Sequence, residues 1–217
     1  MNRQSLEEKE LKLKLRLAQL ERNEACQNNF LQFVRRLWPE FITGRHHEII
    51  AEKLERVAKG ELKRLIINMA PRHTKSEFAS FLFPAWMMGR KPNMKIIQAT
   101  HTTELAVNFG RKTKNMIDSD DYKEIFPEVK LAADSKASGR WDTSAGGMYY
   151  AVGVGSNLAG RGGDLVIIDD PHSEQTAMSN NGFDDAWEWY TGGPRQRLQP
   201  GGSIVLVQTR WSEKDMT

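Results

Sequence analysis

The sequence has almost no cysteine and no long apolar run. Cys26 is the single cysteine among 217 residues, which excludes an internal disulfide framework and a cysteine-based zinc site and suits a reducing compartment. No apolar stretch approaches the roughly 20 residues that a membrane-spanning helix needs. Charges within the first ten residues also predict that no signal peptide is present. We therefore expect a cytoplasmic protein that is not associated with a membrane.

Histidine is also scarce, and its spacing gives no metal site. The five histidines are His46, His47, His73, His101 and His172. None has a zinc-ligand partner at the usual spacing, so we expect ordinary surface or loop histidines. His73 differs only because it falls in a candidate phosphate loop, where it would contact a nucleotide.

The composition fits a globular protein with one sizeable domain. Hydrophobic residues make up 39% and charged residues 27% of the sequence, which excludes a disordered or fibrous chain. The net charge of +3 permits nucleic-acid contact but does not require it. The basic cluster of Arg111, Lys112 and Lys114 is either a solvated helix face or a contact for a phosphate backbone.

Helical patterns fill the first part of the chain. Residues 5–25 combine charges of both signs with leucines near a 3.5-residue spacing, and residues 28–43 and 46–58 continue with helical periods. The leucine stripe consists of Leu6, Leu13, Leu17 and Leu20. We favour a stripe docked on the body of the protein, and the alternative is an arm for a neighbouring subunit or partner. We predict a helical extension or lid over residues 1–60, packed on a core of residues 61–217.

Short apolar runs separated by helical stretches then predict a sheet. Four runs have the character of buried strands, and they cover residues 65–69, 95–100, 165–170 and 204–208. A further run, residues 148–154, is expected as an antiparallel or edge strand. The pattern is typical of an α/β domain with a mostly parallel sheet that is flanked by helices on both faces.

The first candidate motif is MAPRHTKS, residues 69–76, between an apolar run and a predicted helix. Backbone N–H groups at such a helix start cradle anions. Lys75 would reach the β- and γ-phosphates of a nucleotide, and the Ser76 hydroxyl would ligate Mg²⁺. Met69 and Thr74 replace the two glycines of the usual G-x-x-x-x-G-K-[ST] pattern. Because a β-branched residue resists positive φ, the loop either differs in detail or tolerates strain.

Two carboxylates form the second motif. Asp169 and Asp170 end an apolar run, directly before Pro171. The carboxyl ends of parallel strands share one edge of a sheet, where ligands bind in α/β folds. Asp169 would hold the water shell of Mg²⁺, and Asp170 would orient the attacking water. The alternative is a simple polar turn, since Asp-Pro is good turn chemistry.

Two further segments carry candidate residues. Gln208, Thr209 and Arg210 end the last apolar run, where they either sense a γ-phosphate and contact DNA or a neighbour, or simply lead the strand out of the core. Arg161 lies in a glycine-rich stretch. That stretch is either a flexible loop or the carrier of an arginine finger, an arginine that completes the site of a neighbouring subunit. Arg140 is a weaker candidate for the same role.

Together these motifs resemble the ATPase domain of the large terminase subunit of tailed bacteriophages, over residues 28–217. The segments that carry the resemblance are RHHEIIAEKLERV, MAPRHTKSE, AGRGGDLVIIDDPHSEQTAMS and WYTGGPRQRLQPGGSIVLVQTRWSEKDM. The resemblance implies an additional-strand P-loop NTPase of the RecA/ASCE-like type, with ATP and Mg²⁺ as cofactors. It implies an ATP hydrolase that drives double-stranded DNA into a procapsid.

The resemblance also assigns roles to residues. It implies that Lys75 and Ser76 are the loop lysine and serine, that Arg72 stabilises transition-state charge or signals the nucleotide state, and that Asp169 organises Mg²⁺. The implied nucleotide contacts are Pro71, Arg72, His73, Thr74, Lys75, Ser76 and Glu77.

Further implied roles fall on the carboxylates and the last strand. Asp170 matches the catalytic carboxylate, but many terminases have glutamate at this position, so Glu174 is the fallback. Gln208, Thr209 and Arg210 match the motif that couples hydrolysis to movement.

The resemblance finally implies partners and a place of action. We expect a homo-oligomeric ring, a pentamer when assembled on the portal protein and a monomer in isolation, with a small terminase subunit as a further partner in the host cytoplasm. The sequence stops soon after the coupling motif, so we expect no nuclease domain on this chain. Two rival interpretations are another nucleic-acid translocase of helicase-like type and a nucleotide-binding module without efficient hydrolysis.

Overall fold

The computed structural model describes residues 3–135, 137–179 and 181–217, and its centre is a six-stranded sheet. The spatial order of the strands is β1-β6-β5-β2-β4-β3. Their bounds are β1 (Arg64–Asn68), β2 (Lys95–Thr100), β3 (Arg140–Asp142), β4 (Met148–Gly153), β5 (Gly163–Asp169) and β6 (Leu198–Gln208). All neighbouring pairs are parallel except β3 with β4. The predicted mostly parallel α/β sheet is thus confirmed.

The position of β4 differs in part from the expectation for residues 148–154. This strand is not at the edge: it pairs parallel with β2 on one side and antiparallel with the short edge strand β3 on the other. The physical reason is the connection: after β2 the chain passes through two helices and returns to the amino edge before β4 begins, which is the crossover that parallel strands need. Stacking of Trp141 on Tyr149, with ring centroids 5.0 Å apart, secures the short edge strand.

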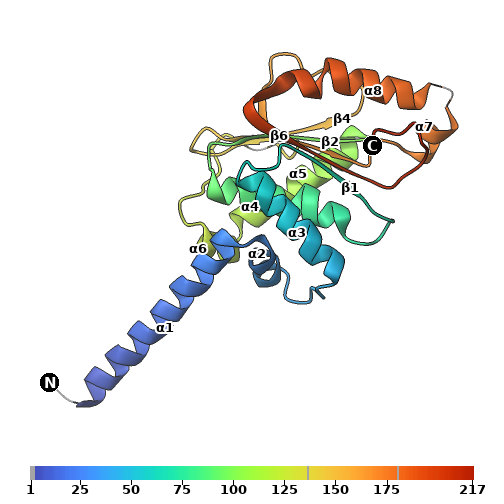
Figure 1. The fold of residues 1–217 in the computed structure, drawn as a ribbon. Helices are drawn as coiled ribbons and strands as arrows, with labels where there is room; N and C mark the ends of the chain where they lie inside the picture. Colours follow the sequence, from blue (N-terminus) through green and yellow to red (C-terminus); the bar gives the residue numbers. More distant parts are fainter. Residues whose placement is uncertain (1–2, 136, 180) are drawn as a thin grey trace.

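Helices cover both faces of the sheet (Figure 1). One face carries α2 (Phe30–Leu37), α3 (Arg45–Ala58), the π-helical turn Glu77–Leu82, α4 (Phe83–Arg90), α5 (Thr103–Asp118) and α6 (Asp120–Ile125). The other carries α7 (Glu174–Met178), α8 (Gly182–Gly192) and the 3₁₀ turn Pro194–Arg197. Side chains alternate between the two cores along each strand: Val205 and Val207 of β6 point into the first, and Ile204 and Leu206 into the second.

The two helices predicted for residues 28–43 and 46–58 are both present. The first of them, α2, is shorter than predicted at both of its ends. Asn29 caps α2, since its side chain accepts a hydrogen bond from the backbone N–H of Gln32, so the helix starts at Phe30. The helix ends at Leu37, just before the residue that precedes Pro39, a position that disfavours helical backbone.

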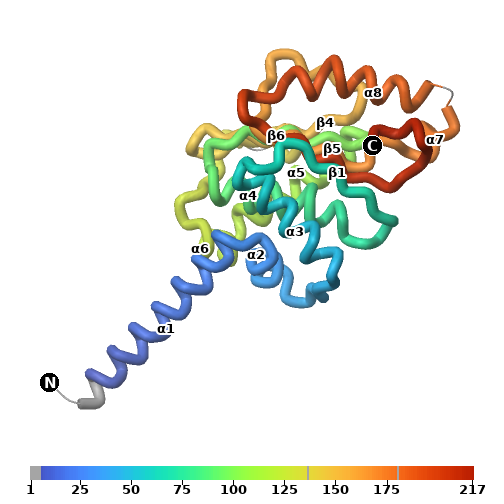
Figure 2. Tube along the Cα trace, in the orientation of Figure 1, coloured from blue at the N-terminus to red at the C-terminus, as the bar shows by residue number. Residues whose placement is uncertain are grey.

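The first helix, α1 (Arg3–Asn28), projects from the body as an arm (Figures 1 and 2). Only its carboxyl-terminal end docks: Asn23 Nδ2 donates to the Glu124 carbonyl at 2.7 Å, and the Trp86 indole donates to the Cys26 carbonyl at 2.9 Å. The interpretation that the leucine stripe packs on the body is wrong, because Leu6, Leu13, Leu17 and Leu20 are all exposed.

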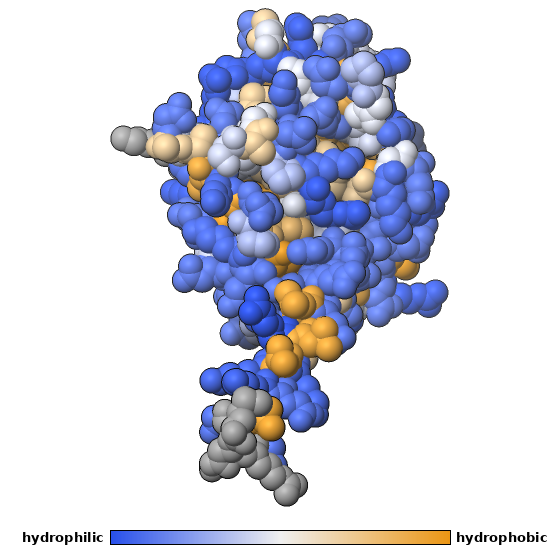
Figure 3. Space-filling model, turned by 90° about the vertical axis from the view of Figure 1, so that its left-hand side faces the viewer, coloured by the Kyte–Doolittle hydropathy of each residue, from blue (hydrophilic) through white to orange (hydrophobic). Residues whose placement is uncertain are grey.

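Exposed apolar side chains are visible along this arm in Figure 3. Leu11 and Leu15 are exposed as well and lie on the opposite side of the helix from the stripe, given a rotation of about 100° per residue. The arm therefore has no single apolar side that the body can cover. The other interpretation, an arm for a neighbouring subunit or partner, stays a prediction.

Candidate nucleotide-binding site

The loop of residues 69–76 lies at the carboxyl edge of the sheet. The Met69 N–H donates to the Gln208 carbonyl at 3.1 Å, and the Thr209 hydroxyl donates to the Met69 carbonyl at 3.3 Å. β6 lies between β1, which leads into the loop, and β5, which ends in Asp169. The insertion of β6 between β1 and β5 is the strand order predicted for an additional-strand fold. It brings the carboxyl ends of these three strands close together.

Lys75 meets a carboxylate of the second motif. Its Nζ lies 2.9 Å from Asp170 Oδ2, and Lys75 is only 5% exposed. A buried ammonium group needs an anionic partner, because leaving it unpaired away from water costs several kcal/mol by an order-of-magnitude estimate. Asp170 serves as that partner.

Ser76 meets the other carboxylate, and this one is buried. The Ser76 hydroxyl donates to Asp169 Oδ1 at 3.0 Å. Burial, and then the charge of Asp170, raises the pKa of Asp169 to about 7, while the nearby Ser80 and Ser76 hydroxyls and Lys75 act in the opposite direction. Asp169 Oδ2 is buried and has no hydrogen-bond partner among the described residues.

These two side chains fit one edge of a magnesium site. A buried carboxylate oxygen without a partner calls for an ion or a water, and a hydroxyl beside a carboxylate is a hard-oxygen donor set. No cluster of three or more His, Cys, Asp or Glu side chains suited to a metal occurs in the part of the chain that the structure describes. A magnesium ion bound by Ser76 and Asp169 would therefore need phosphate and water oxygens to complete its shell.

The backbone is strained at this edge. Three non-glycine residues among those described have positive φ, and all lie here: Arg72 at 62°, Thr74 at 60° and Asp170 at 40°. Each such residue costs on the order of 1–3 kcal/mol and persists only where its surroundings hold it. For Thr74, the sequence left open whether the loop differs or tolerates strain, and the structure shows a threonine that tolerates it.

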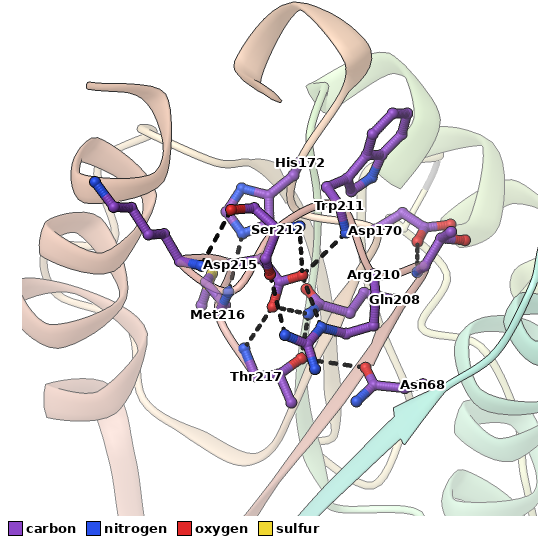
Figure 4. A network of polar contacts seen from close by, with 12 residues as sticks. Asn68, Asp170, His172, Gln208, Arg210, Trp211, Ser212, Asp215, Met216 and Thr217 are labelled. Carbon is purple, nitrogen blue, oxygen red and sulfur yellow. Dashed lines mark hydrogen bonds and ion pairs between the residues drawn. The ribbon is translucent and has the colours of Figure 1, made fainter. Parts of the chain in front are cut away.

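Gln208, Thr209 and Arg210 connect the end of β6 to Asp170 and to Asp215 (Figure 4). The Thr209 N–H donates to Asp170 Oδ1 at 2.8 Å, so the last strand touches the predicted catalytic carboxylate. Gln208 Nε2 donates to Asp215 Oδ1 at 3.0 Å, and Arg210 Nε lies 2.9 Å from Asp215 Oδ2. The end of β6 thus contacts both Asp170 and Asp215, which lies in the segment that follows β6.

Asp215 is a residue that the sequence reasoning did not single out. Its side chain is fully buried, and it also accepts hydrogen bonds from the backbone N–H groups of Trp211, Ser212 and Thr217. Burial alone would raise the pKa of Asp215, but these bonds and the one from Arg210 hold it well below its usual range. The signal in the sequence was turn chemistry, a serine and an aspartate shortly after a strand.

Two histidines are buried: His47 lies in a helix rather than at a surface or loop position, and His172 lies in a loop as expected. His47 in α3 is 6% exposed, and its Nε2 lies 2.6 Å from Thr74 Oγ1. His172, directly after Pro171, is 2% exposed and accepts a hydrogen bond from the Met216 N–H through Nε2 at 3.2 Å. Both join separate segments at the candidate site, and nothing in the spacing of the histidines indicated this.

The remaining loop residues lie around the phosphate loop. Pro71, Arg72 and His73 are exposed, and Arg72 makes no hydrogen bond or ion pair with any described residue. His73 Nδ1 lies 2.9 Å from the Pro71 carbonyl oxygen. Glu77 forms an ion pair with Lys112 at 2.8 Å.

Two candidate catalytic residues are not brought to Lys75 within one chain. Glu174 begins α7, is exposed, and lines an open cleft of about 750 Å³ next to the carboxyl end of β5. Arg161 lies two residues before β5 begins, at the edge of the sheet opposite Asp169, and its guanidinium stacks 3.9 Å from the Tyr150 ring centroid. Arg140 begins the edge strand β3.

The fold and the site define a class: a mostly parallel α/β protein with a phosphate-loop-like turn and two acidic residues at the carboxyl edge of its sheet. Among solved structures, this fold is similar to the HK97 bacteriophage large terminase, with a TM-score of 0.56 and 13% sequence identity. The match covers 85% of this chain and 38% of that protein, so the chain spans well under half of its length. The resemblance predicted from the motifs is confirmed at the level of the fold. No family model and no curated protein matches the chain.

Proposed function

We propose that this chain is the ATP-binding and ATP-hydrolysing motor part of a terminase large subunit. The observation that supports this proposal most strongly is a pair of contacts at one edge of the sheet: Lys75 contacts Asp170, and Ser76 contacts Asp169. A lysine, a hydroxyl and two carboxylates in this arrangement are the parts that phosphoryl transfer to water requires. Similarity to the HK97 large terminase supports the assignment to DNA packaging rather than to another ATPase class.

The residues would divide the chemistry as follows. The loop N–H groups and Lys75 bind the phosphates, so Lys75 exchanges its contact with Asp170 for one with the nucleotide. Asp170, released from the lysine, orients the attacking water and receives its proton. Ser76 and Asp169 hold Mg²⁺, which when bound neutralises charge on the phosphate oxygens.

An arginine would complete the site. Arg72 is exposed on the phosphate loop and has no partner among the described residues, so it is available to the nucleotide of its own chain. Arg161 serves only if a neighbouring chain presents it, as in a ring. Mixing Arg161→Ala and Asp170→Ala subunits tests this directly: partial recovery of hydrolysis in the mixture supports action between subunits, and no recovery at any ratio argues against it.

Nucleotide binding and hydrolysis are tested together on the isolated chain. Binding of a fluorescent ATP analogue with Mg²⁺ is titrated for wild type, Lys75→Ala and Asp169→Asn, with Lys123→Ala as the control because that lysine is exposed and pairs with Asp118, outside the site. We expect both site variants to lose affinity by at least about 100-fold and the control to match wild type. Equal affinity for the ATP analogue in all four proteins would contradict the proposed nucleotide site.

Two matched variants test which carboxylate, Asp170 or Glu174, is catalytic. Asp170→Asn removes the group that contacts Lys75, and Glu174→Gln removes the exposed fallback group at the start of α7. We expect Asp170→Asn to abolish phosphate release and Glu174→Gln to retain it within about threefold. The reverse result would assign the role to Glu174.

A binding module with slow turnover is the second candidate. It is favoured by two observations: within one chain Lys75 pairs with Asp170, and Arg161 stacks on Tyr150 away from the site. Single-turnover phosphate release discriminates the two, because a module of this kind binds ATP tightly but releases phosphate no faster when DNA or assembled rings are added.

Partners follow from the same proposal. We infer double-stranded DNA as the cargo, a homo-oligomeric ring, a portal protein and a small terminase subunit, acting in the host cytoplasm. No helix in the described ranges is long and apolar enough to span a bilayer. In the basic cluster of α5, Arg111, Lys112 and Lys114 bond to Asn108, Glu77 and the Ser135 carbonyl, respectively, so a contact with DNA would have to replace these bonds. DNA binding that weakens steeply with salt would support the cargo assignment.

A further inference from the structure

Thr74 occupies an unfavourable place in the phosphate loop. Its φ of 60° is in the left-handed region, which glycine adopts readily and a β-branched residue rarely adopts. Its carbonyl also accepts the Phe78 N–H at 3.0 Å, so the same residue starts the helical turn that follows the loop. Contacts with the surrounding structure must stabilise this backbone conformation, because it is strained for a threonine.

A directed chain of hydrogen bonds runs through His47 and Thr74 to the His73 carbonyl. The Gly44 N–H donates to His47 Nδ1 at 2.9 Å, so Nδ1 is an acceptor and the ring proton is on Nε2. His47 Nε2 then donates to Thr74 Oγ1 at 2.6 Å, and the Thr74 hydroxyl donates to the His73 carbonyl at 2.6 Å. Every donor in this chain has one acceptor, which fixes the tautomer and the direction of the chain.

His47 itself is rigidly held. Its ring stacks on Phe78 with centroids 5.0 Å apart and meets the Phe41 ring edge-on at 4.7 Å. Burial, and then the neighbouring His46 and His73, lowers the pKa of His47, which keeps the ring neutral as the hydrogen bonds require. A histidine on α3 therefore fixes a loop that lies 27 residues further along the chain.

We propose that His47 is a positioning residue that holds the phosphate loop in its nucleotide-binding shape, taking over the conformational role that glycine has in ordinary phosphate loops. The inference rests on the proposed nucleotide site, and it assigns His47 a part in binding the triphosphate without contact to it. It predicts a specific dependence: the loop needs His47 only while position 74 carries a threonine.

The test is a double-mutant cycle on nucleotide affinity. Affinity for the fluorescent ATP analogue is measured for wild type, His47→Phe, Thr74→Gly and the double variant, with His47→Gln as the conservative variant. His47→Phe keeps the aromatic packing but removes both hydrogen bonds. We expect His47→Phe to weaken binding about tenfold when threonine is at position 74 and less than about twofold when glycine is there, whatever affinity Thr74→Gly itself has. We expect His47→Gln, which retains an N–H donor, to recover most of the loss.

Hydrogen exchange of the loop amides supplies a readout that does not depend on nucleotide. His47→Phe should speed exchange over residues 69–78 in the threonine background and leave it unchanged in the glycine background. An equal loss of affinity and equal exchange in both backgrounds would overturn the inference, since His47 would then act only through general stability. If no protein binds nucleotide but the exchange rates still couple, the proposed function fails and the loop-holding role of His47 stands. Circular dichroism identifies a His47→Phe chain that does not fold, and His47→Gln then carries the comparison.

Discussion

The carboxyl edge of the sheet and the α1 arm differ in how much buried charge and backbone strain they contain. At the sheet edge, buried charges are paired, three non-glycine residues hold positive φ, and the strands and loops are joined by side-chain hydrogen bonds. On the arm, the leucine stripe is exposed, and only the last turns contact the body. The difference shows where this sequence accepts strain and buried charge, and such places mark function more reliably than apolar pattern does.

The largest effect should come from removing Asp215, which accepts hydrogen bonds from the end of β6 and from the segment that follows it. Asp215→Ala leaves the Gln208 amide, the Arg210 guanidinium and three backbone N–H groups without their buried acceptor. We expect a loss of about 3–5 kcal/mol in the free energy of unfolding, measured by urea denaturation. As the matched control, Glu213→Ala changes the exposed acid two residues earlier and should stay within about 0.5 kcal/mol of wild type. A similar small change for Asp215→Ala would contradict this role of Asp215.

Asp169 should give the site a pH signature of the opposite sign from ordinary paired acids. Its pKa of about 7 in the folded chain lies above the unfolded value, so the protonated form is favoured by folding. The contribution of Asp169 then becomes steadily less favourable as the pH rises from about 4 to about 7, and it levels off above that range.

Asp169→Asn removes this titration, because an amide carries no charge at any pH. In the ligand-free protein we expect the variant to be more stable than wild type at about pH 8, by on the order of 1–3 kcal/mol, and to match wild type near about pH 4. Thermal unfolding across this pH range is the measurement. A wild-type chain that is no less stable, relative to Asp169→Asn, at the higher pH would contradict the buried state of Asp169.

The smallest effects belong to the arm. Leu13→Ser and Leu17→Ser should each change the free energy of unfolding by less than about 0.5 kcal/mol, because both side chains are exposed. Leu54→Ala, at a fully buried position of α3, is the contrasting variant and should cost about 2–5 kcal/mol. If the two serine variants were as destabilised as Leu54→Ala, the arm would dock on the body in solution, as the sequence first suggested.

Sequence predicted those parts of the site that follow from the ends of strands. The polar groups that follow three apolar runs, namely Lys75 and Ser76, Asp169 and Asp170, and Gln208, were expected at one edge of the sheet, and the parallel sheet places them there. Asp215 and His47 were missed for one physical reason. Their roles depend on contacts between segments that are packed by the fold, and such contacts leave no period or spacing in the chain.

The errors of sequence reasoning have a related origin. The orientation of residues 148–154 depended on the path of the connection that precedes them, and an apolar run has no direction. The docking of the leucine stripe depended on whether the body offers a complementary face, which helical spacing does not encode.

The central claim is that Lys75 and the two acids serve one magnesium-bound triphosphate. A crystal structure of the chain with a non-hydrolysable ATP analogue and Mg²⁺ tests it most directly. The account predicts Lys75 Nζ on the β- and γ-phosphate oxygens, Asp170 released from the lysine, and Asp169 Oδ2 facing the metal shell. A nucleotide bound elsewhere, with Lys75 still paired to Asp170, would contradict it.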